Sequence, residues 1–283
     1  MKQFKLTLIA VAVICMASPV IAQKALAKAD LAFANRQYFS AVELYKSAYT
    51  GVKKADLKAK VLYRTAFAYQ EINDMKSAET YYQKAIAAKY ADPEAIVRLA
   101  DVLKQQGKYP EAITEYNNFK KLAPSDPRGD KGVKSSELAQ QWKDNPGRYK
   151  IENMALINSK ESDFSPSYSD KKYNTLVFTS TREGVNQKQD ITTGQNHSKM
   201  YETKLDKNGK WSTPLLLAGA VSSAFNDGSA CMSKKGDFML MTRCPEVKSK
   251  VSGCQIYMAK KQGSGWAEPV KLPFNIDTVV FGH

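Results

Sequence analysis

The sequence predicts a multidomain α + β chain, in which an N-terminal α-solenoid is followed by an incomplete β-propeller of about two blades. Two observations predict this class. An Ala-rich helical pattern recurs at intervals of 37 and 34 residues in the first half of the chain. From Tyr149 onward it gives way to short β-branched and aromatic runs broken by turns, and these runs occur twice.

Residues 1–22 have the features of a secretory signal peptide that is cleaved after Ala22. Lys2 and Lys5 precede the apolar run LTLIAVAVICMA. That run is about a dozen residues long, short of the roughly 20 that a membrane-spanning helix needs. Cys15 leaves lipidation open as the less favoured alternative, because the residue before it is an isoleucine rather than a small residue.

Three phrases define the helical repeat: QYFSAVELYKSAY at 37–49, DMKSAETYYQKAI at 74–86 and KYPEAITEYNNFK at 108–120. Each phrase has an alanine followed four residues later by a tyrosine, in the pairs Ala41/Tyr45, Ala78/Tyr82 and Ala112/Tyr116. The spacing matches the tetratricopeptide repeat of roughly 34 residues. A small residue is needed where two helices cross, and an aromatic ring one turn later fills the space beside the crossing.

We therefore expect three tetratricopeptide repeats at 23–126, and a capping helix and linker at 127–148. Leu138 and Trp142 are the expected apolar stripe of the cap. Such an array presents a concave groove to a peptide or protein segment. Each candidate groove residue taken alone also fits ordinary surface or core. The predicted partner-binding residues are Asp30, Phe33, Tyr63, Phe67, Gln70, Val97, Asp101 and Lys104.

Residues 149–283 are predicted to form a partial β-propeller, with two blades and the start of a third. The expected strands are YKIENMA, PSYS, TLVFTST and KMYETKLD, then SACMS, DFMLMTR and CQIYMAKK. The corresponding residues are Asp163/Asp227, Ser169/Ser233, Arg182/Arg243, Tyr201/Tyr257 and Trp211/Trp266. We expect the aspartates to accept backbone N–H bonds before each first strand and the arginines to bind carbonyl groups. The polar insert at 183–198 is a candidate binding loop.

Cleavage after residue 22 leaves 40 Lys and Arg against 28 Asp and Glu. The lysines are scattered along the sequence, which favours solvated surface charge over nucleic-acid binding. Cys244 and Cys254 flank a loop containing Pro and Gly, and they are predicted to form a disulfide in an oxidising compartment. Cys231 is expected to be a small buried residue.

No motif predicts catalysis, a cofactor or a metal. The sequence has no G-x-S-x-G element, GDKGVKSS lacks the P-loop ending, and QGSGWAE lacks the third glycine of a dinucleotide fingerprint. The two histidines, His197 and His283, are far apart in the sequence, and no Cys/His spacing indicates a metal site. We expect a non-catalytic protein without a cofactor.

The phrases SDFSPSYS and TLVFTSTR, downstream of a tetratricopeptide array and a signal peptide, resemble periplasmic outer-membrane proteins of Bacteroidetes-type bacteria. The closest resemblance is to the PorE family of the type IX secretion machinery. In that family a TolB-like or WD-repeat-like propeller follows the repeats, and an OmpA-like peptidoglycan-binding domain follows the propeller.

The resemblance implies a scaffold that binds envelope or secretion-complex proteins in the periplasm, in association with the outer membrane. Only two blades fit these residues and no OmpA-like domain follows them, so we expect a fragment, with peptidoglycan contact only through the missing domain. The alternative is a propeller that acts as a receptor for a glycan or peptide in envelope uptake.

Overall fold

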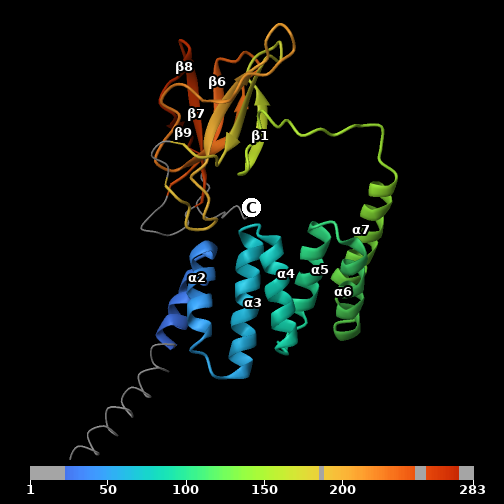
Figure 1. Cartoon of the computed structure of the whole chain (residues 1–283). Helices are drawn as coiled ribbons and strands as arrows, with labels where there is room; N and C mark the ends of the chain where they lie inside the picture. The colour runs from blue at the N-terminus through green and yellow to red at the C-terminus, as the bar shows by residue number, and fades with distance from the viewer. Residues whose placement is uncertain (1–22, 185–187, 246–252, 274–283) are drawn as a thin grey trace, which may run out of the picture. The chain divides into compact units, whose positions relative to one another are not determined.

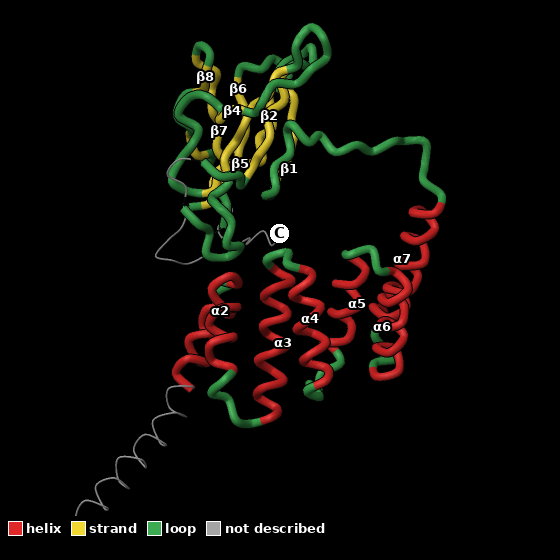
Figure 2. Tube along the Cα trace, in the orientation of Figure 1, coloured by secondary structure: helices red, strands yellow, loops and turns green. Residues whose placement is uncertain are grey.

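The computed structural model describes residues 23–184, 188–245 and 253–273. The chain divides into two compact units. One contains the helices up to Lys150 together with Ile191–Thr193, and the other contains the sheets, from Ile151 to Asp190 and from Gly194 onward. Helices and strands do not mix within either unit (Figure 2). The expected signal peptide, Cys15 and the expected start of a third blade lie outside the described residues.

Seven helices form the described part of the helical unit, and each lies beside its sequence neighbours as an α-solenoid (Figure 1). The first covers residues 23–34. The others are α2 (Tyr38–Tyr49), α3 (Ala55–Glu71), α4 (Met75–Ala87), α5 (Glu94–Gln105), α6 (Tyr109–Leu122) and α7 (Pro127–Asp144). The repeat thus consists of helix pairs, and we call the helix at 23–34, α3, α5 and α7 the first helices.

The alanine and tyrosine positions of the repeat form its core, as the spacing predicts. Ala41, Ala78 and Ala112 are completely buried on the second helices. The rings of the three tyrosines that follow them are also buried. A larger side chain at the alanine positions would push the paired helices apart, because protein interiors have no free volume for it.

Helix α7 covers the last pair, but with a different face from the expected one. Leu138 and Trp142 are 42% and 67% exposed, so the prediction that they form the covering stripe is wrong. The contact face is made instead by Gly129, Gly132 and Ser136, which are buried. A Cβ atom on Gly132 would lie 2.3 Å from the ring of Tyr116, so only a glycine lets α7 approach that ring.

The sheet unit is an incomplete β-propeller of two antiparallel sheets. The first has the order β1 (Asp163–Tyr168), β2 (Thr175–Ser180), β3 (Lys199–Lys204), β4 (Leu215–Leu216). The second has β5 (Asn226–Met232), β6 (Phe238–Cys244), β7 (Gln255–Gln262) and β8 (Gly265–Trp266), with β9 (Val270–Lys271) also on β7. The expected strand YKIENMA is irregular instead, and its Ile151 is 95% exposed.

The two sheets pack face to face through one apolar core. Val177 and Met200 of the first sheet meet Met239 and Met241 of the second, and all four are at most 1% exposed. The backbone of Gly228 in β5 lies close to the side chain of Thr179 in β2. A Cβ atom on Gly228 would lie only 2.5 Å from the Thr179 methyl group. This packing fixes the register of the repeated motifs described below.

Candidate functional site

The candidate site is the face formed by the first helices of the helical unit. Helix α3 contacts α5 and α5 contacts α7, so successive first helices touch one another. Within the described residues, α4 packs mainly on its sequence neighbours α3 and α5. The array therefore closes up on the side of the first helices, which makes that side the concave one. We call this surface the first-helix face.

Arginine side chains connect successive repeats across this face. The Arg64 guanidinium lies over the Phe33 ring at 5.5 Å and forms an ion pair with Asp30. One repeat later, the Arg98 guanidinium lies over the Phe67 ring at 4.9 Å. Each arginine thus covers an aromatic ring of the preceding first helix, an arrangement in which the cation and the ring attract each other.

Glu94 holds the arginines at the far end of the face. Its carboxylate accepts from Arg98 Nε and Arg128 Nη1, each at 2.8 Å. Burial alone would raise the pKa of Glu94, but the hydrogen bonds from both arginines bring that pKa below its ordinary value. The carboxylate is therefore ionised at neutral pH and helps to keep both guanidinium groups in place.

A tyrosine hydroxyl fixes one polar residue of the face in each repeat. Tyr45 Oη donates to Asp30 at 2.7 Å, and Tyr116 Oη donates to Asp101 at 2.5 Å. In the second repeat the position equivalent to these aspartates is Phe67, and the Tyr82 hydroxyl donates instead to Gln70 at 2.7 Å. The buried tyrosines thereby set the orientation of polar groups on the first helices.

Seven of the eight predicted partner-binding residues are at least partly accessible, but not all belong to one surface. Asp30, Phe33 and Phe67 lie together, because the Phe33 and Phe67 ring centroids are 5.4 Å apart and Arg64 joins Phe33 to Asp30. Tyr63 stacks on Tyr90 at 4.5 Å, and burial raises the pKa of Tyr63 to about 12.

Three further predicted residues, Val97, Asp101 and Lys104, differ in how accessible they are. Val97 is 1% exposed and lies in the core, so its assignment to the groove is wrong. It occupies the same repeat position as Tyr63, but its shorter side chain ends inside the helix packing. Asp101 and Lys104 are half-buried, and Lys104 Nζ donates to Ser135 of α7 at 3.2 Å.

Arg64 and Arg98 are not among the residues predicted from the sequence, although the sequence contains a signal for them. They are 34 residues apart, the same interval that separates Ala78 from Ala112. A repeated charged residue two positions before the first-helix alanine marks a place where every repeat meets its predecessor. Position alone did not reveal which ring each arginine covers, because that depends on how neighbouring repeats stack.

The sheet unit repeats a second cluster, in which an aspartate joins the start of each blade to the end of a strand. Asp163 accepts from Ser159 N at 2.6 Å and from Arg182 at 2.7 Å. Arg182 also donates to the Ile157 carbonyl oxygen at 2.7 Å. The expectation that the aspartate binds a backbone amide and the arginine binds a carbonyl group is confirmed. These hydrogen bonds give the cluster a structural role.

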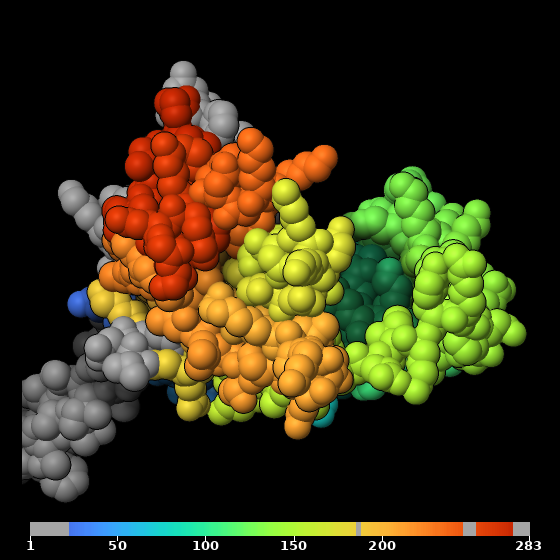
Figure 3. Space-filling view, turned by 90° about the horizontal axis from the view of Figure 1, so that it is seen from above, coloured from blue at the N-terminus to red at the C-terminus, as the bar shows by residue number. Residues whose placement is uncertain are grey.

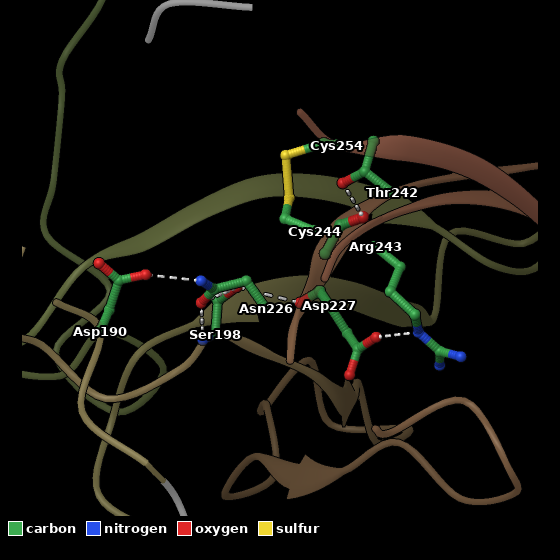
Figure 4. Close-up of a disulfide and its surroundings, with 9 residues drawn as sticks. Asp190, Ser198, Asn226, Asp227, Thr242, Arg243, Cys244 and Cys254 are labelled. Atoms are coloured by element: carbon green, nitrogen blue, oxygen red, sulfur yellow. Dashed lines mark hydrogen bonds and ion pairs between the residues drawn. A yellow bond between two sulfur atoms is a disulfide. The ribbon is translucent and has the colours of Figure 1, made fainter. Parts of the chain in front are cut away.

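The second copy of the cluster, of which Figure 4 shows the Asp227–Arg243 pair, is more completely buried and also connects the two sheets. Asp227 accepts from Arg243 Nε at 2.6 Å and from Ser223 N at 2.6 Å. Lys199 of the first sheet reaches it at 3.1 Å. Burial lowers the pKa of Lys199, and the nearby Asp227 carboxylate opposes this change.

The structure joins Cys244 and Cys254 by a disulfide, with Cα atoms 4.0 Å apart (Figure 4). Cys231 is exposed, so the expectation of a buried residue is wrong. It lies opposite Leu240 in the β5–β6 pair, on the face of the second sheet that points away from the first. Side chains alternate between the two faces of a strand, and this alternation puts Cys231 on that face. The sequence alone does not show which face of the sheet packs on its neighbour.

The described part of the polar insert is folded back on itself. Asp190 N donates to the Gln195 carbonyl oxygen and Gly194 N donates to the Asp190 carbonyl oxygen, each at 2.8 Å. His197 is 1% exposed, and its Nδ1 lies 2.9 Å from the Ala224 carbonyl oxygen. These groups support the fold, and no observation singles out this loop as a ligand site. Residues 185–187 lie outside the described part.

No cluster of three or more His, Cys, Asp or Glu side chains within the described ranges could hold a metal ion. Within the same ranges, no helix has the length and apolar content needed to cross a bilayer.

The geometry defines the helical unit as a tetratricopeptide-type array of paired helices. No protein-family model matches the chain, and no curated protein sequence matches it. Solved structures match part of the chain. The myosin chaperone UNC-45 is similar at 23% identity with a TM-score of 0.39, covering 44% of this chain.

Two further solved structures give similar values. UNC-45 from C. elegans in complex with a Hsp90 peptide has 22% identity and a TM-score of 0.39, over 44% of this chain. The Sgt2 TPR domain from Aspergillus fumigatus has 16% identity and a TM-score of 0.39, over 47% of this chain and 87% of its own. The match spans 14% of the length of the UNC-45 chains.

Proposed function

We propose that the chain is a non-catalytic scaffold whose first-helix face holds an extended segment of a partner protein. The observation that carries the proposal is the row formed by Asp30, Arg64, Phe33, Phe67 and Arg98, which crosses three successive first helices. These side chains are half-buried, so they are fixed in place while part of each remains accessible.

The row offers both apolar contact and hydrogen-bond donors. Arg98 uses Nε for Glu94, and its two Nη groups make no hydrogen bond to another described residue, so they can donate to carbonyl or carboxylate oxygens of a bound segment. Aromatic and arginine side chains dominate the binding energy of many protein interfaces. Because the ring contacts hold them in place, less side-chain entropy is lost on binding.

The proposal extends to location and assembly. The N-terminal segment with signal-peptide features and the order of modules support an exported scaffold of the periplasm, associated with the outer membrane and with a secretion complex of type IX. The disulfide between Cys244 and Cys254 supports an oxidising compartment. The partners in this proposal are envelope or secretion-complex proteins.

Site-specific photocrosslinking tests the proposed surface. A benzoylphenylalanine at position 67 places the probe on the first-helix face, and the same residue at Tyr81 of α4 is the matched aromatic control. We expect irradiation in envelope fractions to attach a defined envelope protein at position 67 and not at position 81. Arg64→Ala with Arg98→Ala should remove that adduct. Equal labelling at both positions, or labelling that ignores the arginines, contradicts the proposal.

A further inference from the structure

Lysines that are scattered in the sequence gather at one end of the sheet unit. In antiparallel sheets, the first and third connections of each blade lie at the same end. Those connections are 169–174 and 205–214 in the first sheet and 233–237 and 263–264 in the second. Figure 1 shows the hairpins at 169–174 and 233–237 at the same end of the sheet unit.

The two hairpins lie side by side. A Cβ atom on Gly236 of the second hairpin would be 3.1 Å from the carbonyl oxygen of Ser169 in the first. Figure 3 looks onto this end and shows the yellow segment of the first hairpin beside the orange segment of the second. We call this surface the lysine end, because it carries eight exposed lysines: Lys171, Lys172, Lys207, Lys210, Lys234, Lys235, Lys260 and Lys261.

The aspartates of the same turns accept hydrogen bonds from within those turns. Asp170 accepts from the amides of Lys172 and Thr175 at 2.7 Å and 2.5 Å. Asp206 accepts from the amides of Asn208 and Lys210 at 2.8 Å and 2.9 Å. Asp237 accepts from the Ser233 hydroxyl at 2.6 Å. Turn formation thus uses these carboxylates, and none of the eight ammonium groups forms an ion pair with another described residue.

Exposed aromatic side chains stand among these lysines. Tyr173 is 64% exposed and Tyr168 is 46% exposed, with their rings edge to face at 5.1 Å. Phe238, which follows the second hairpin, is 37% exposed. Large rings beside lysines at a hairpin tip match the boundary between water and lipid, where aromatic side chains are enriched. A soluble polyanion offers charge but no apolar layer for these rings.

We propose that the lysine end docks on the surface of an anionic lipid bilayer. The lysines lie against the anionic headgroups, and Tyr168, Tyr173 and Phe238 enter the interfacial layer. Basic side chains near such a surface each add to its attraction for a protein, and that attraction is weakened by salt. The lysine end and the first-helix face consist of different residues, so the scaffold can hold a protein segment with one set and a membrane with the other.

Vesicle co-sedimentation of the chain from Gln23 tests the proposal. We expect binding to vesicles of phosphatidylglycerol mixed with phosphatidylcholine, no binding to phosphatidylcholine alone, and release at high salt. The quadruple variant Lys171→Gln, Lys172→Gln, Lys234→Gln, Lys235→Gln should weaken the affinity at least about tenfold. The matched control removes the same charge from exposed positions of the helical unit, by Lys53→Gln, Lys54→Gln, Lys60→Gln and Lys131→Gln.

Tyr173→Ser separates a membrane from a soluble polyanion, because it leaves the charge unchanged. We expect it to weaken vesicle binding and to leave any binding of dextran sulfate unchanged. The proposal is overturned if the control quadruple variant weakens vesicle binding as much as the lysine-end variant. It is also overturned if dextran sulfate binds through the lysine end while the vesicles do not, which would indicate an acidic glycan as the partner.

Discussion

The hydroxyl of Tyr116 donates a hydrogen bond of 2.5 Å to Asp101 from inside the helical core. The ring is 1% exposed, whereas Asp101 is half-buried on the first-helix face. Burial and this hydrogen bond raise the pKa of Tyr116, so the hydroxyl stays protonated and remains a donor. The same relationship between Tyr45 and Asp30 in the first repeat shows that the core positions the face above it.

Tyr116→Phe should keep the ring packing and remove only the hydrogen bond. We expect the free energy of unfolding to fall by about 1–2 kcal/mol, because the acceptor is charged. Urea unfolding followed by circular dichroism at the helix band measures this change. Tyr81→Phe is the control, since the Tyr81 hydroxyl makes no hydrogen bond to another described residue. An equal loss in both variants would show that the Tyr116 hydroxyl has no special role.

Gly132→Ala tests the close approach of α7 to Tyr116. The added Cβ would lie 2.3 Å from the ring, so the helix or the ring must move. Overpacking of this kind costs about 1–3 kcal/mol, which outweighs the gain of up to about 1 kcal/mol in helix propensity. We expect a lower urea midpoint.

Gly147→Ala is the control for this substitution, because no atom lies within 4 Å of the added Cβ. We expect it to leave the urea midpoint unchanged. A midpoint for Gly132→Ala at or above that of the parent chain would mean that α7 does not pack on Tyr116.

The parts of the fold that the sequence predicts are those set by spacing. Alanine and tyrosine four residues apart specify a helix crossing, and the recurrence of Asp163 and Arg182 as Asp227 and Arg243 specifies a repeated blade. Each needs only the geometry of one repeat. The predicted binding residues Asp30 and Phe67 follow from the same register, and the structure places both on the first-helix face.

The remaining features depend on how one repeat meets the next. Val97 and Tyr63 share a repeat position, but side-chain length decides which one reaches the surface. Cys231 alternates to the face of its sheet that points away from the first sheet, and Trp142 turns outward because the glycines of α7 pack inward. The lysine end shows the same effect with charge, because folding gathers residues that the sequence disperses.

Removing the disulfide should destabilise the sheet unit, because the unfolded chain without the bond has more conformational entropy. Cys244 and Cys254 are 10 residues apart, and a loop of this size corresponds to about 2–3 kcal/mol in the chain-entropy account. We expect Cys244→Ser with Cys254→Ser to lower the urea midpoint, measured by tryptophan fluorescence. The parent chain in reducing agent should match the double variant. No change under reduction would show that the bond does not form in solution.

Acid should weaken the sheet unit through Asp163. Burial alone would raise the pKa of Asp163, but hydrogen bonds from Ser180, Ser159 and Arg182 bring it below its ordinary value. A carboxylate with a depressed pKa in the folded state stabilises the fold above its unfolded pKa of about 3.9, and this contribution is lost as the pH falls through that value toward the folded pKa.

Asp163→Asn separates this carboxylate from the general effect of acid. At pH 7 the variant should unfold at a lower urea concentration than the parent. Its free energy of unfolding should be lower by about 2 kcal/mol, because Arg182 and Ser159 lose a charged acceptor. Below the folded pKa the two curves should converge, since the parent is then also neutral at this position. Trp211 and Trp266 belong to the sheet unit and report its unfolding by fluorescence. A difference that stays constant from neutral to acid pH would assign the loss to packing rather than to the charge of Asp163.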